Sequence, residues 1–458
     1  MKRPSKKIRN RILLLILLIG LGYAGFYAWR SFPIISGFSA KNACSCTFIQ
    51  GRSKQSIQSE ELGMMPLSLA SIDINLKDSS VTGSVWGVAK RKAIYREGVG
   101  CTLVNDIPEQ QVRKQQFNIP VAVATSDTSS WLYGHGESNV KMNKALMDSA
   151  LKFVFHHKYK EKDANTRAVL VVQNGKIIAE RYAPGYNKDS RFLGWSMAKS
   201  ITGTLIGILV KEGKLSLNAP APLDQWKNPK DKRHSISIEN LLQQTSGLNF
   251  VENYNSYSDV TNMLFDRGDM AAFAAALPLK QKPGTYFYYS SGNSNILSYI
   301  IRKTVGEKDY HAFPYNTLFH KIGMNHALLE PDASGTFVGS SYVYASARDY
   351  ARFGLLLLND GVWNSERILP EGWVKKSTSA PGASILKDYG YQIWLNGFDK
   401  NNTGARQFPE APPEMFFADG FGGQRIYIIP SLHMVIVRMG LDLFDEHTFL
   451  KKLFTSVQ

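Results

Sequence analysis

The sequence predicts an α+β fold in which an antiparallel sheet is packed by helices, preceded by an amino-terminal transmembrane segment. Three observations predict it: two strand-like runs at residues 168–182, a central block of helix-like segments, and two further strand-like runs near the carboxyl end. Strands on both sides of a helical block favour one antiparallel sheet covered by helices. With 458 residues, 44% of them hydrophobic and 20% charged, the chain can bury a large core.

The first thirty residues predict a membrane anchor. They hold seven basic residues and no acidic one, and residues 12–29 form an uncharged run dominated by Leu and Ile. This run approaches the length of a bilayer span, and the basic residues before it favour the cytoplasmic side. A cleaved signal peptide is the alternative, but aromatic residues crowd the candidate cleavage positions. We expect residues 1–30 to be a signal-anchor with the remainder at the periplasmic face of a bacterial inner membrane, or else secreted.

Residues 31–145 form an amino-terminal region of unassigned role, with strand-like runs at 84–88 and 121–124. All three cysteines lie here. In an oxidising compartment Cys101 would pair with either Cys44 or Cys46 and leave one thiol free; three buried thiols are the alternative. A C-x-C pair without a nearby histidine fits zinc badly, so no metal site is predicted. The net charge of +16 comes with no nucleic-acid-binding pattern, and no nucleic-acid partner is expected.

Residues 146–458 contain the elements that predict the sheet. Asn174-Gly175 between the two runs at 168–182 is a strong hairpin signal. A helix is predicted from Ser196 to about Glu212, ended by Gly213. Other helices are expected near 238–244, 294–305 and 348–359. A glycine-rich turn at 417–424 is expected to enter a strand, and the runs 425–430 and 434–439 are expected to pair as a hairpin.

The most informative stretch of the chain is Ser196-Met197-Ala198-Lys199. On a helix, residues three apart share a face, so the Lys199 amine can reach the Ser196 hydroxyl. Apolar neighbours such as Trp195 and Ile201 would lower the pKa of Lys199 and leave part of it neutral, able to accept the serine proton. The spacing predicts a serine nucleophile with a lysine base, although the same four residues also occur by chance in ordinary helices.

Two later motifs accompany this one, Tyr289-Ser290-Ser291 and Ala418-Asp419-Gly420, and the stretches 241–248, 345–354 and 389–394 fit the same pattern. With them the chain resembles the serine β-lactamase and penicillin-binding-protein superfamily over roughly residues 150–455. It is most similar to the class C-like branch, which includes 6-aminohexanoate-dimer hydrolases and family VIII-type esterases. The resemblance implies a sheet domain and a helical subdomain with the nucleophile helix between them.

The resemblance also implies roles for further residues. Tyr289 would act with Lys199 in proton transfer, and the backbone N–H groups of Ser196 and Phe421 would form the oxyanion hole. The residues expected to bind substrate are Ser291, Tyr389, Trp394, Asp419 and Gly420. This chemistry requires neither a metal nor an organic cofactor, and the expected partner is a small ester or amide.

The chain departs from the family pattern at two positions. Ala418 stands where the family has a Lys or His that holds a substrate carboxylate, and Ser291 stands where the branch has Asn. Both changes favour a serine hydrolase that cleaves an ester or amide through an acyl-enzyme. The alternatives are a β-lactamase or D-Ala-D-Ala carboxypeptidase, and a non-catalytic penicillin-binding-like module. A Ser-His-Asp centre using His433 or His447 is a further alternative, since Gly194-Trp195-Ser196 resembles a nucleophile elbow.

Overall fold

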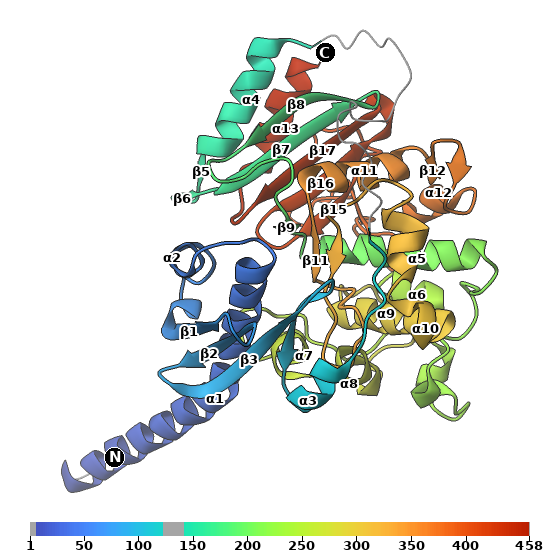
Figure 1. The fold of residues 1–458 in the computed structure, drawn as a ribbon. Helices are drawn as coiled ribbons and strands as arrows, with labels where there is room; N and C mark the ends of the chain where they lie inside the picture. Colours follow the sequence, from blue (N-terminus) through green and yellow to red (C-terminus); the bar gives the residue numbers. More distant parts are fainter. Residues whose placement is uncertain (1–5, 122–141, 458) are drawn as a thin grey trace.

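The structure is a computed structural model that describes residues 6–121 and 142–457 (Figure 1). Its centre is a six-stranded antiparallel sheet with the strand order β14-β15-β16-β17-β7-β8. The predicted α+β fold with an antiparallel sheet is therefore confirmed. The six strands are β7 (Thr166–Gln173), β8 (Lys176–Tyr182), β14 (Trp394–Leu395), β15 (Phe416–Gly420), β16 (Gln424–Ile429) and β17 (Met434–Gly440).

Helices cover both faces of this sheet. Neighbouring residues of β7 enter different cores, because successive side chains of a strand point to opposite faces: Leu170 packs in the larger core, and Val169 and Val171 pack in the smaller one. The strand is therefore apolar along most of its length rather than alternating. The covering helices are α5 (Met197–Lys211) and α11 (Ala347–Leu358) on one side and α4 (Lys144–His156) and α13 (Glu446–Ser456) on the other.

A helical subdomain packs against α5 from the side opposite the sheet (Figure 1). Its helices are α6 (Ile238–Leu242), α7 (Asp259–Asp266), α8 (Met270–Ala276), α9 (Ser291–Val305) and α10 (Glu307–Tyr310). Almost every side chain of α5 is buried, since this helix contacts β15 and β16 on one side and α9 on the other. Helix α5 thus lies between the two parts of the fold, as the resemblance implies.

The remaining short elements connect these layers. They are α12 (Trp373–Ser377), β5 (Lys158–Tyr159), β6 (Lys162–Asp163), β9 (Phe192–Leu193), β10 (Leu328–Leu329), β11 (Val343–Ala345), β12 (Val362–Trp363) and β13 (Glu366–Arg367). Strands β10, β11 and β9 form a small sheet, and β9 is the strand that directly precedes α5 in the sequence.

Most predicted elements occur where the sequence places them. The hairpin at 168–182 is confirmed, with Asn174 and Gly175 both at positive φ between β7 and β8. The hairpin of β16 and β17 is also confirmed. The helix predicted from Ser196 is α5, in which Ser196 and Glu212 are the capping residues.

Two predicted boundaries are wrong. Residues 417–420 belong to strand β15, so the glycine turn is confined to Phe421–Gly423, between β15 and β16. Helix α9 begins at Ser291 rather than at residue 294. The N–H of Ser291 donates to the carboxylate of Glu252 (2.8 Å), and this cap comes from a loop that is remote in sequence.

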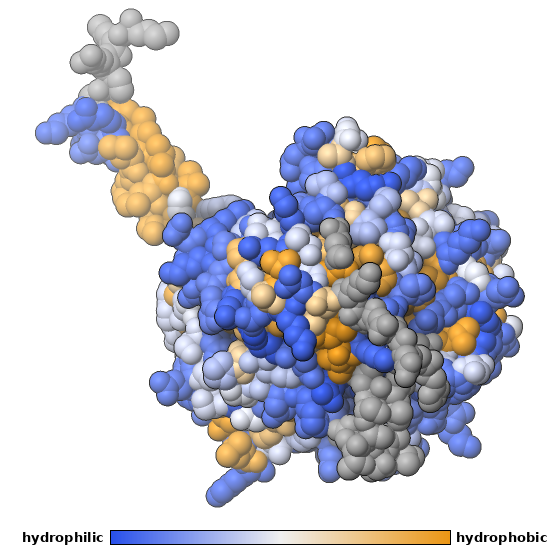
Figure 2. Space-filling view, turned by 90° about the horizontal axis from the view of Figure 1, so that it is seen from above, coloured by the Kyte–Doolittle hydropathy of each residue, from blue (hydrophilic) through white to orange (hydrophobic). Residues whose placement is uncertain are grey.

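The amino-terminal region consists of one long helix beside a four-stranded antiparallel sheet. Helix α1 (Lys6–Phe48) has 43 residues and extends well past the predicted apolar run. Its first half projects from the folded body, whereas residues 34–46 are buried (Figure 2). The helix is long and apolar enough to cross a membrane. A signal sequence near the amino terminus meets the same criteria. The other elements are α2 (Lys54–Ser56), β1 (Ala70–Asn75), β2 (Ser80–Val85), β3 (Val88–Arg96), β4 (Gly100–Val104) and α3 (Glu109–Lys114).

The strand-like runs expected in this region have different outcomes. Residues 84–88 do not form one strand, because Trp86 and Gly87 adopt positive φ in the turn between β2 and β3. The run at 121–124 lies almost entirely outside the described residues.

A buried ion pair joins α1 to the rest of the protein. The Lys41 amine contacts the Glu330 carboxylate, and both side chains are fully buried. Glu330 also accepts hydrogen bonds from the Ser45 hydroxyl (2.8 Å) and the Cys101 N–H (2.6 Å). The disulfide next to this cluster is Cys44–Cys101, which leaves Cys46 as a buried free thiol. The amino-terminal region and the six-stranded sheet domain therefore share one continuous interior.

We predict that Glu330→Gln lowers the free energy of unfolding of the full chain by about 3–5 kcal/mol, because the buried Lys41 would lose its counterion and would have to give up its proton or stay as an unpaired charge. Urea unfolding in detergent measures the change. Glu366→Gln, which removes the partner of Lys321 in a solvent-exposed pair, should leave the unfolding midpoint unchanged. Equal midpoints for the unsubstituted chain and Glu330→Gln would contradict the prediction.

Candidate active site

Ser196 lies at the start of α5, where a sharp turn follows β9. Trp195 adopts a positive φ of 46°, an uncommon conformation for a non-glycine residue that turns the chain into the helix. The Ser196 side chain is only partly buried, whereas the residues that follow it in α5 are buried. The hydroxyl is thus presented at the open end of an otherwise enclosed helix.

Lys199 lies within hydrogen-bonding distance of Ser196. Its amine lies 2.9 Å from the Ser196 hydroxyl oxygen, 3.1 Å from the Ser291 hydroxyl oxygen and 3.0 Å from the Ser340 carbonyl oxygen. The residue is 1% exposed, and burial lowers the pKa of Lys199 to about 8 although the charges of Glu252 and Asp419 act in the opposite direction. A substantial fraction of this amine is neutral near neutral pH.

The three contacts dictate where the lone pair of a neutral Lys199 points. A carbonyl oxygen can only accept, so one N–H of the amine donates to Ser340. The Ser291 hydroxyl hydrogen is directed to the Glu252 carboxylate (2.6 Å), which leaves the Ser291 oxygen free to accept the second N–H of Lys199. The lone pair of the neutral amine then faces the remaining neighbour, the Ser196 hydroxyl.

Glu252 and Tyr254 complete this cluster, and the sequence gives no motif that identifies them. Besides Ser291, the Glu252 carboxylate accepts a hydrogen bond from the Tyr254 hydroxyl (2.8 Å), which lies 3.2 Å from the Ser291 hydroxyl. Both residues lie in the irregular segment before α7, about forty residues before Ser291. A short polar loop of this kind carries no local signal of its own, and the Ser340 carbonyl is likewise a backbone group that no residue type reveals.

Tyr289 is held against Lys199 by two aromatic rings. The Lys199 amine lies 4.8 Å from the centroid of the Tyr289 ring, which stacks on Trp394 (5.3 Å) and meets Tyr389 edge-on (5.7 Å). Burial raises the pKa of Tyr289 well above its ordinary value, and a contact with the Ser196 side chain acts in the opposite direction. Tyr289 is therefore a neutral phenol at neutral pH and can donate a proton.

Two of the residues expected to bind substrate, Ser291 and Tyr389, are buried. Ser291 is 0% exposed, because the first turn of α9 directs it inward to Lys199 and Glu252. Tyr389 is 1% exposed and supports the Tyr289 ring. Neither side chain is exposed in this structure, and their contact with substrate stays a prediction. Trp394 remains partly exposed beside Tyr289.

The end of β15 lies against the turn of residues 194–196, which carries the candidate nucleophile and is called the nucleophile turn below. Gly420 approaches Gly194 so closely that a Cβ atom at position 420 would lie 2.2 Å from the Gly194 carbonyl oxygen. The following residue, Phe421, is 63% exposed, and its ring contacts Trp195 (5.9 Å). The buried Arg438 stabilises the turn that carries Phe421, because its guanidinium donates to the carbonyls of Gly422 and Gly423.

Ala418 is buried, and the nearby cation is already paired. Asp419 faces Arg425 across the antiparallel pair β15–β16, and the Arg425 guanidinium contacts both Asp419 and Glu446. Burial raises the pKa of Asp419, which the charge of Arg425 partly offsets. Two carboxylates therefore compete with any anionic ligand for Arg425.

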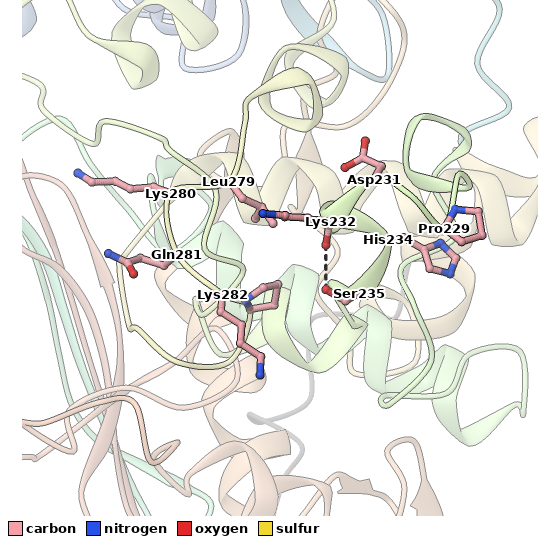
Figure 3. Close-up of a pocket in the computed structure, with 10 residues that line it drawn as sticks. Pro229, Asp231, Lys232, His234, Ser235, Leu279, Lys280, Gln281 and Lys282 are labelled. Carbon is pink, nitrogen blue, oxygen red and sulfur yellow. Dashed lines mark hydrogen bonds between the residues drawn. The ribbon is translucent and has the colours of Figure 1, made fainter.

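The histidine alternatives lie elsewhere. His433 occupies the turn between β16 and β17, at the end of β16 opposite the glycine turn, roughly 17 Å away along the six-residue strand. His447 is exposed on α13 and contacts Glu410. The groove drawn in Figure 3, about 520 Å³ in volume, is also distinct: it lies between residues 229–235 and 279–283, and its lining contains no member of the Ser196 cluster.

Comparison with known proteins identifies the family of this fold. A family model described as β-lactamase matches residues 151–440. The chain belongs to the β-lactamase family. Among curated β-lactamase relatives, the 6-aminohexanoate-dimer hydrolase of Paenarthrobacter ureafaciens is 25% identical over 298 residues, which are 60% of this chain and 72% of the relative. The predicted membership of the serine β-lactamase superfamily is confirmed.

Solved structures of this family share the fold. A Bacillus anthracis protein described as a 6-aminohexanoate-dimer hydrolase aligns with a TM-score of 0.53 and 24% identity, over 64% of this chain and 78% of that protein. A family VIII carboxylesterase aligns with a TM-score of 0.50 and 14% identity, over 68% and 95% of the two chains. About a third of this chain lies outside each alignment.

We predict that Gly420→Ala destabilises the protein by about 1–3 kcal/mol and slows covalent labelling at Ser196, because the new methyl group would displace the nucleophile turn. Thermal unfolding and the labelling rate measure the two effects. Gly382→Ala is the matched control, since a Cβ atom there meets nothing within 4 Å. Unchanged stability and labelling in Gly420→Ala would contradict the close approach.

Proposed function

We propose that this protein is a serine hydrolase that cleaves an ester or amide through an acyl-enzyme, with Ser196 as nucleophile and Lys199 as base. The observation that carries the proposal is the 2.9 Å contact between the Ser196 hydroxyl and a buried lysine whose pKa is lowered to about 8. The amide hydrolase among the curated relatives supports the same chemistry.

Acylation begins when neutral Lys199 accepts the Ser196 proton. The Ser196 oxygen forms a bond to the substrate carbonyl carbon, and the negative charge that develops on the carbonyl oxygen is stabilised by the N–H groups of Ser196 and Phe421. The close approach of Gly420 to Gly194 supports this pairing, because it brings the strand end before Phe421 beside the nucleophile turn. Tyr289, a neutral phenol, protonates the departing alkoxide or amine and regains its proton from Lys199.

Deacylation repeats the sequence with water. Lys199, neutral again, accepts a proton from a water molecule that attacks the acyl carbon, and the Ser196 oxygen leaves with that proton. The Glu252–Ser291 pair serves both steps, since it keeps the Lys199 lone pair directed at the oxygen that gains or loses a proton.

The surroundings of Arg425 support a substrate without a carboxylate next to the reacting group. Ala418 provides no cation, and the paired Arg425 has Asp419 and Glu446 as counterions. A charge-assisted hydrogen bond to a substrate carboxylate contributes about 1.5–3 kcal/mol in proteins, and Arg425, the cation described near Ala418, is already paired. The alanine at position 418 and the pairing of Arg425 favour an ester or amide hydrolase over a β-lactamase or D-Ala-D-Ala carboxypeptidase.

Helix α1 fits a retained signal-anchor. Basic residues precede its exposed apolar half, and the helix continues without a break into the folded body. The Cys44–Cys101 disulfide agrees with an oxidising compartment. The assignment places the hydrolase on the outer face of the cytoplasmic membrane; a secreted enzyme would instead lack residues 1–30.

The first test concerns the nucleophile. Ser196→Ala should abolish labelling by a fluorophosphonate probe and turnover of p-nitrophenyl butyrate, because it removes the attacking oxygen and little volume. Ser216→Ala, at an exposed serine after α5, should behave like the unsubstituted protein. A probe that still attaches to Ser196→Ala, or a folded unsubstituted protein that never reacts, would instead indicate another nucleophile or a non-catalytic module.

The second test concerns the base. The kcat/KM for p-nitrophenyl butyrate should rise with pH, reach half of its maximum near pH 8 and level off about one pH unit higher, because Lys199 acts only when deprotonated. Glu252→Gln removes a charge that raises the pKa of Lys199, so the rising limb should shift to lower pH. The distant Glu366→Gln is the control. If the rise of kcat/KM with pH stays in place or moves to higher pH in Glu252→Gln, the Glu252 charge does not raise the pKa of Lys199 as proposed.

The third test concerns specificity. We expect a higher kcat/KM for p-nitrophenyl butyrate than for nitrocefin, because the site holds no free cation for the β-lactam carboxylate. Benzylpenicillin and its methyl ester form a matched pair, and removal of the negative charge should not reduce acylation. A clear preference for nitrocefin, together with slower acylation by the methyl ester, would support the β-lactamase alternative.

A further inference from the structure

One loop connects the candidate active site to the base of the projecting helix. In the segment before α7, Glu252 and Tyr254 contact Ser291, and three residues after Tyr254 the Tyr257 hydroxyl accepts a hydrogen bond from Arg30 (3.0 Å). The Arg30 guanidinium also lies over the Tyr257 ring (5.0 Å). Three residues span at most about 11 Å, so the backbone positions that carry the Ser291 contact and the Arg30 contact lie within that distance of each other.

Helix α1 gives a second estimate of the distance between Arg30 and the candidate active site. Arg30 ends the apolar run, and eight residues later the Phe38 ring stacks on Trp195 (6.2 Å), the residue before the nucleophile. Eight residues of α-helix rise about 12 Å. The headgroup region on one side of a bilayer is roughly 5–8 Å thick, so a hydrocarbon layer that ends at Arg30 would leave the nucleophile turn about 4–7 Å beyond the polar surface.

Exposed aromatic side chains follow the same path. Trp29 (79% exposed) lies beside Arg30, and Trp86 (72% exposed) contacts Phe32 on the next turn of α1. At the site itself the exposed rings are Phe421 and Tyr254 (43% exposed), which contact one another (6.4 Å). Aromatic residues concentrate where membrane and water meet. Figure 2 shows the apolar half of α1 projecting directly from the body that carries these rings.

We propose that the Ser196 site acts on an amphiphilic ester or amide that resides in the bilayer surface, with its carbonyl group at the level of the headgroups. The proposal rests on the serine hydrolase function and on the retained anchor. The acyl chain would lie along Phe421 and Tyr254 and form the acyl-enzyme with Ser196. The polar alcohol or amine would leave with a proton from Tyr289, and water would release the carboxylate.

The test uses the full chain reconstituted in phosphatidylcholine vesicles and two esters with the same leaving group. 4-Methylumbelliferyl oleate resides in the bilayer, and 4-methylumbelliferyl butyrate dissolves in water. A flexible Gly-Ser segment of about 20 residues inserted between Arg30 and Ser31 would let the body move roughly 25 Å from the membrane. The control carries the same insertion between Lys160 and Glu161, in the exposed turn between β5 and β6.

The insertion after Arg30 should lower oleate turnover at least tenfold and leave butyrate turnover unchanged, which also shows that the site is folded. The control insertion should change neither rate. If oleate turnover survives the insertion, or both esters lose rate equally, the membrane proposal is overturned while butyrate turnover still supports the hydrolase. If neither ester is cleaved by the unmodified chain, both proposals fail. Recovery of a natural chain that lacks residues 1–30 would overturn the membrane proposal alone.

Discussion

A lysine buried away from water must either lose its proton or have every N–H paired, and the arrangement around Lys199 meets both conditions. When protonated, the amine has three acceptors at about 3 Å: Ser196, Ser291 and Ser340. When neutral, it keeps two of these as acceptors and turns its lone pair to Ser196. The site therefore needs no rearrangement of heavy atoms between the two states, and this balance between burial and hydrogen bonding governs the layout of the surrounding structure.

Each neighbour of Lys199 is held in place by its own contacts with other residues. The Ser340 backbone is held by Asn295 of α9, whose side-chain oxygen accepts the Ser340 N–H (3.1 Å). The Ser291 hydroxyl is oriented by Glu252, and Tyr289 is clamped between aromatic rings. A hydroxyl at position 291 can rotate, whereas the amide of a typical class C-like motif cannot change its donor and acceptor ends in this way. The carboxylate of Glu252 restricts that rotation, because it accepts the Ser291 hydroxyl hydrogen.

The sequence predicts the parts of this protein that depend on local pattern. The Asn174-Gly175 turn and the i, i+3 spacing of Ser196 and Lys199 are properties of neighbouring residues, and both occur as predicted. The early start of α9 and the inward position of Ser291 depend on Glu252, which contacts them only through the tertiary fold. The same holds for Gly420, whose tight contact with Gly194 joins residues more than two hundred positions apart. The extent of α1 could not be predicted from its apolar run, because its second half is stabilised by packing against strands formed later in the chain.

The ion pair between Lys41 and Glu330 also orders events during synthesis. These residues are 289 positions apart, so a ribosome that adds about 5–20 residues per second makes Lys41 wait roughly 15–60 s for its partner. Until then the second half of α1 carries an unpaired cation among apolar neighbours and cannot settle into the interior. If the first half is already held in a bilayer during this interval, the waiting segment is kept apart from other nascent chains. The anchor would then act as a tether that protects the protein while the residues between Lys41 and Glu330 are being made.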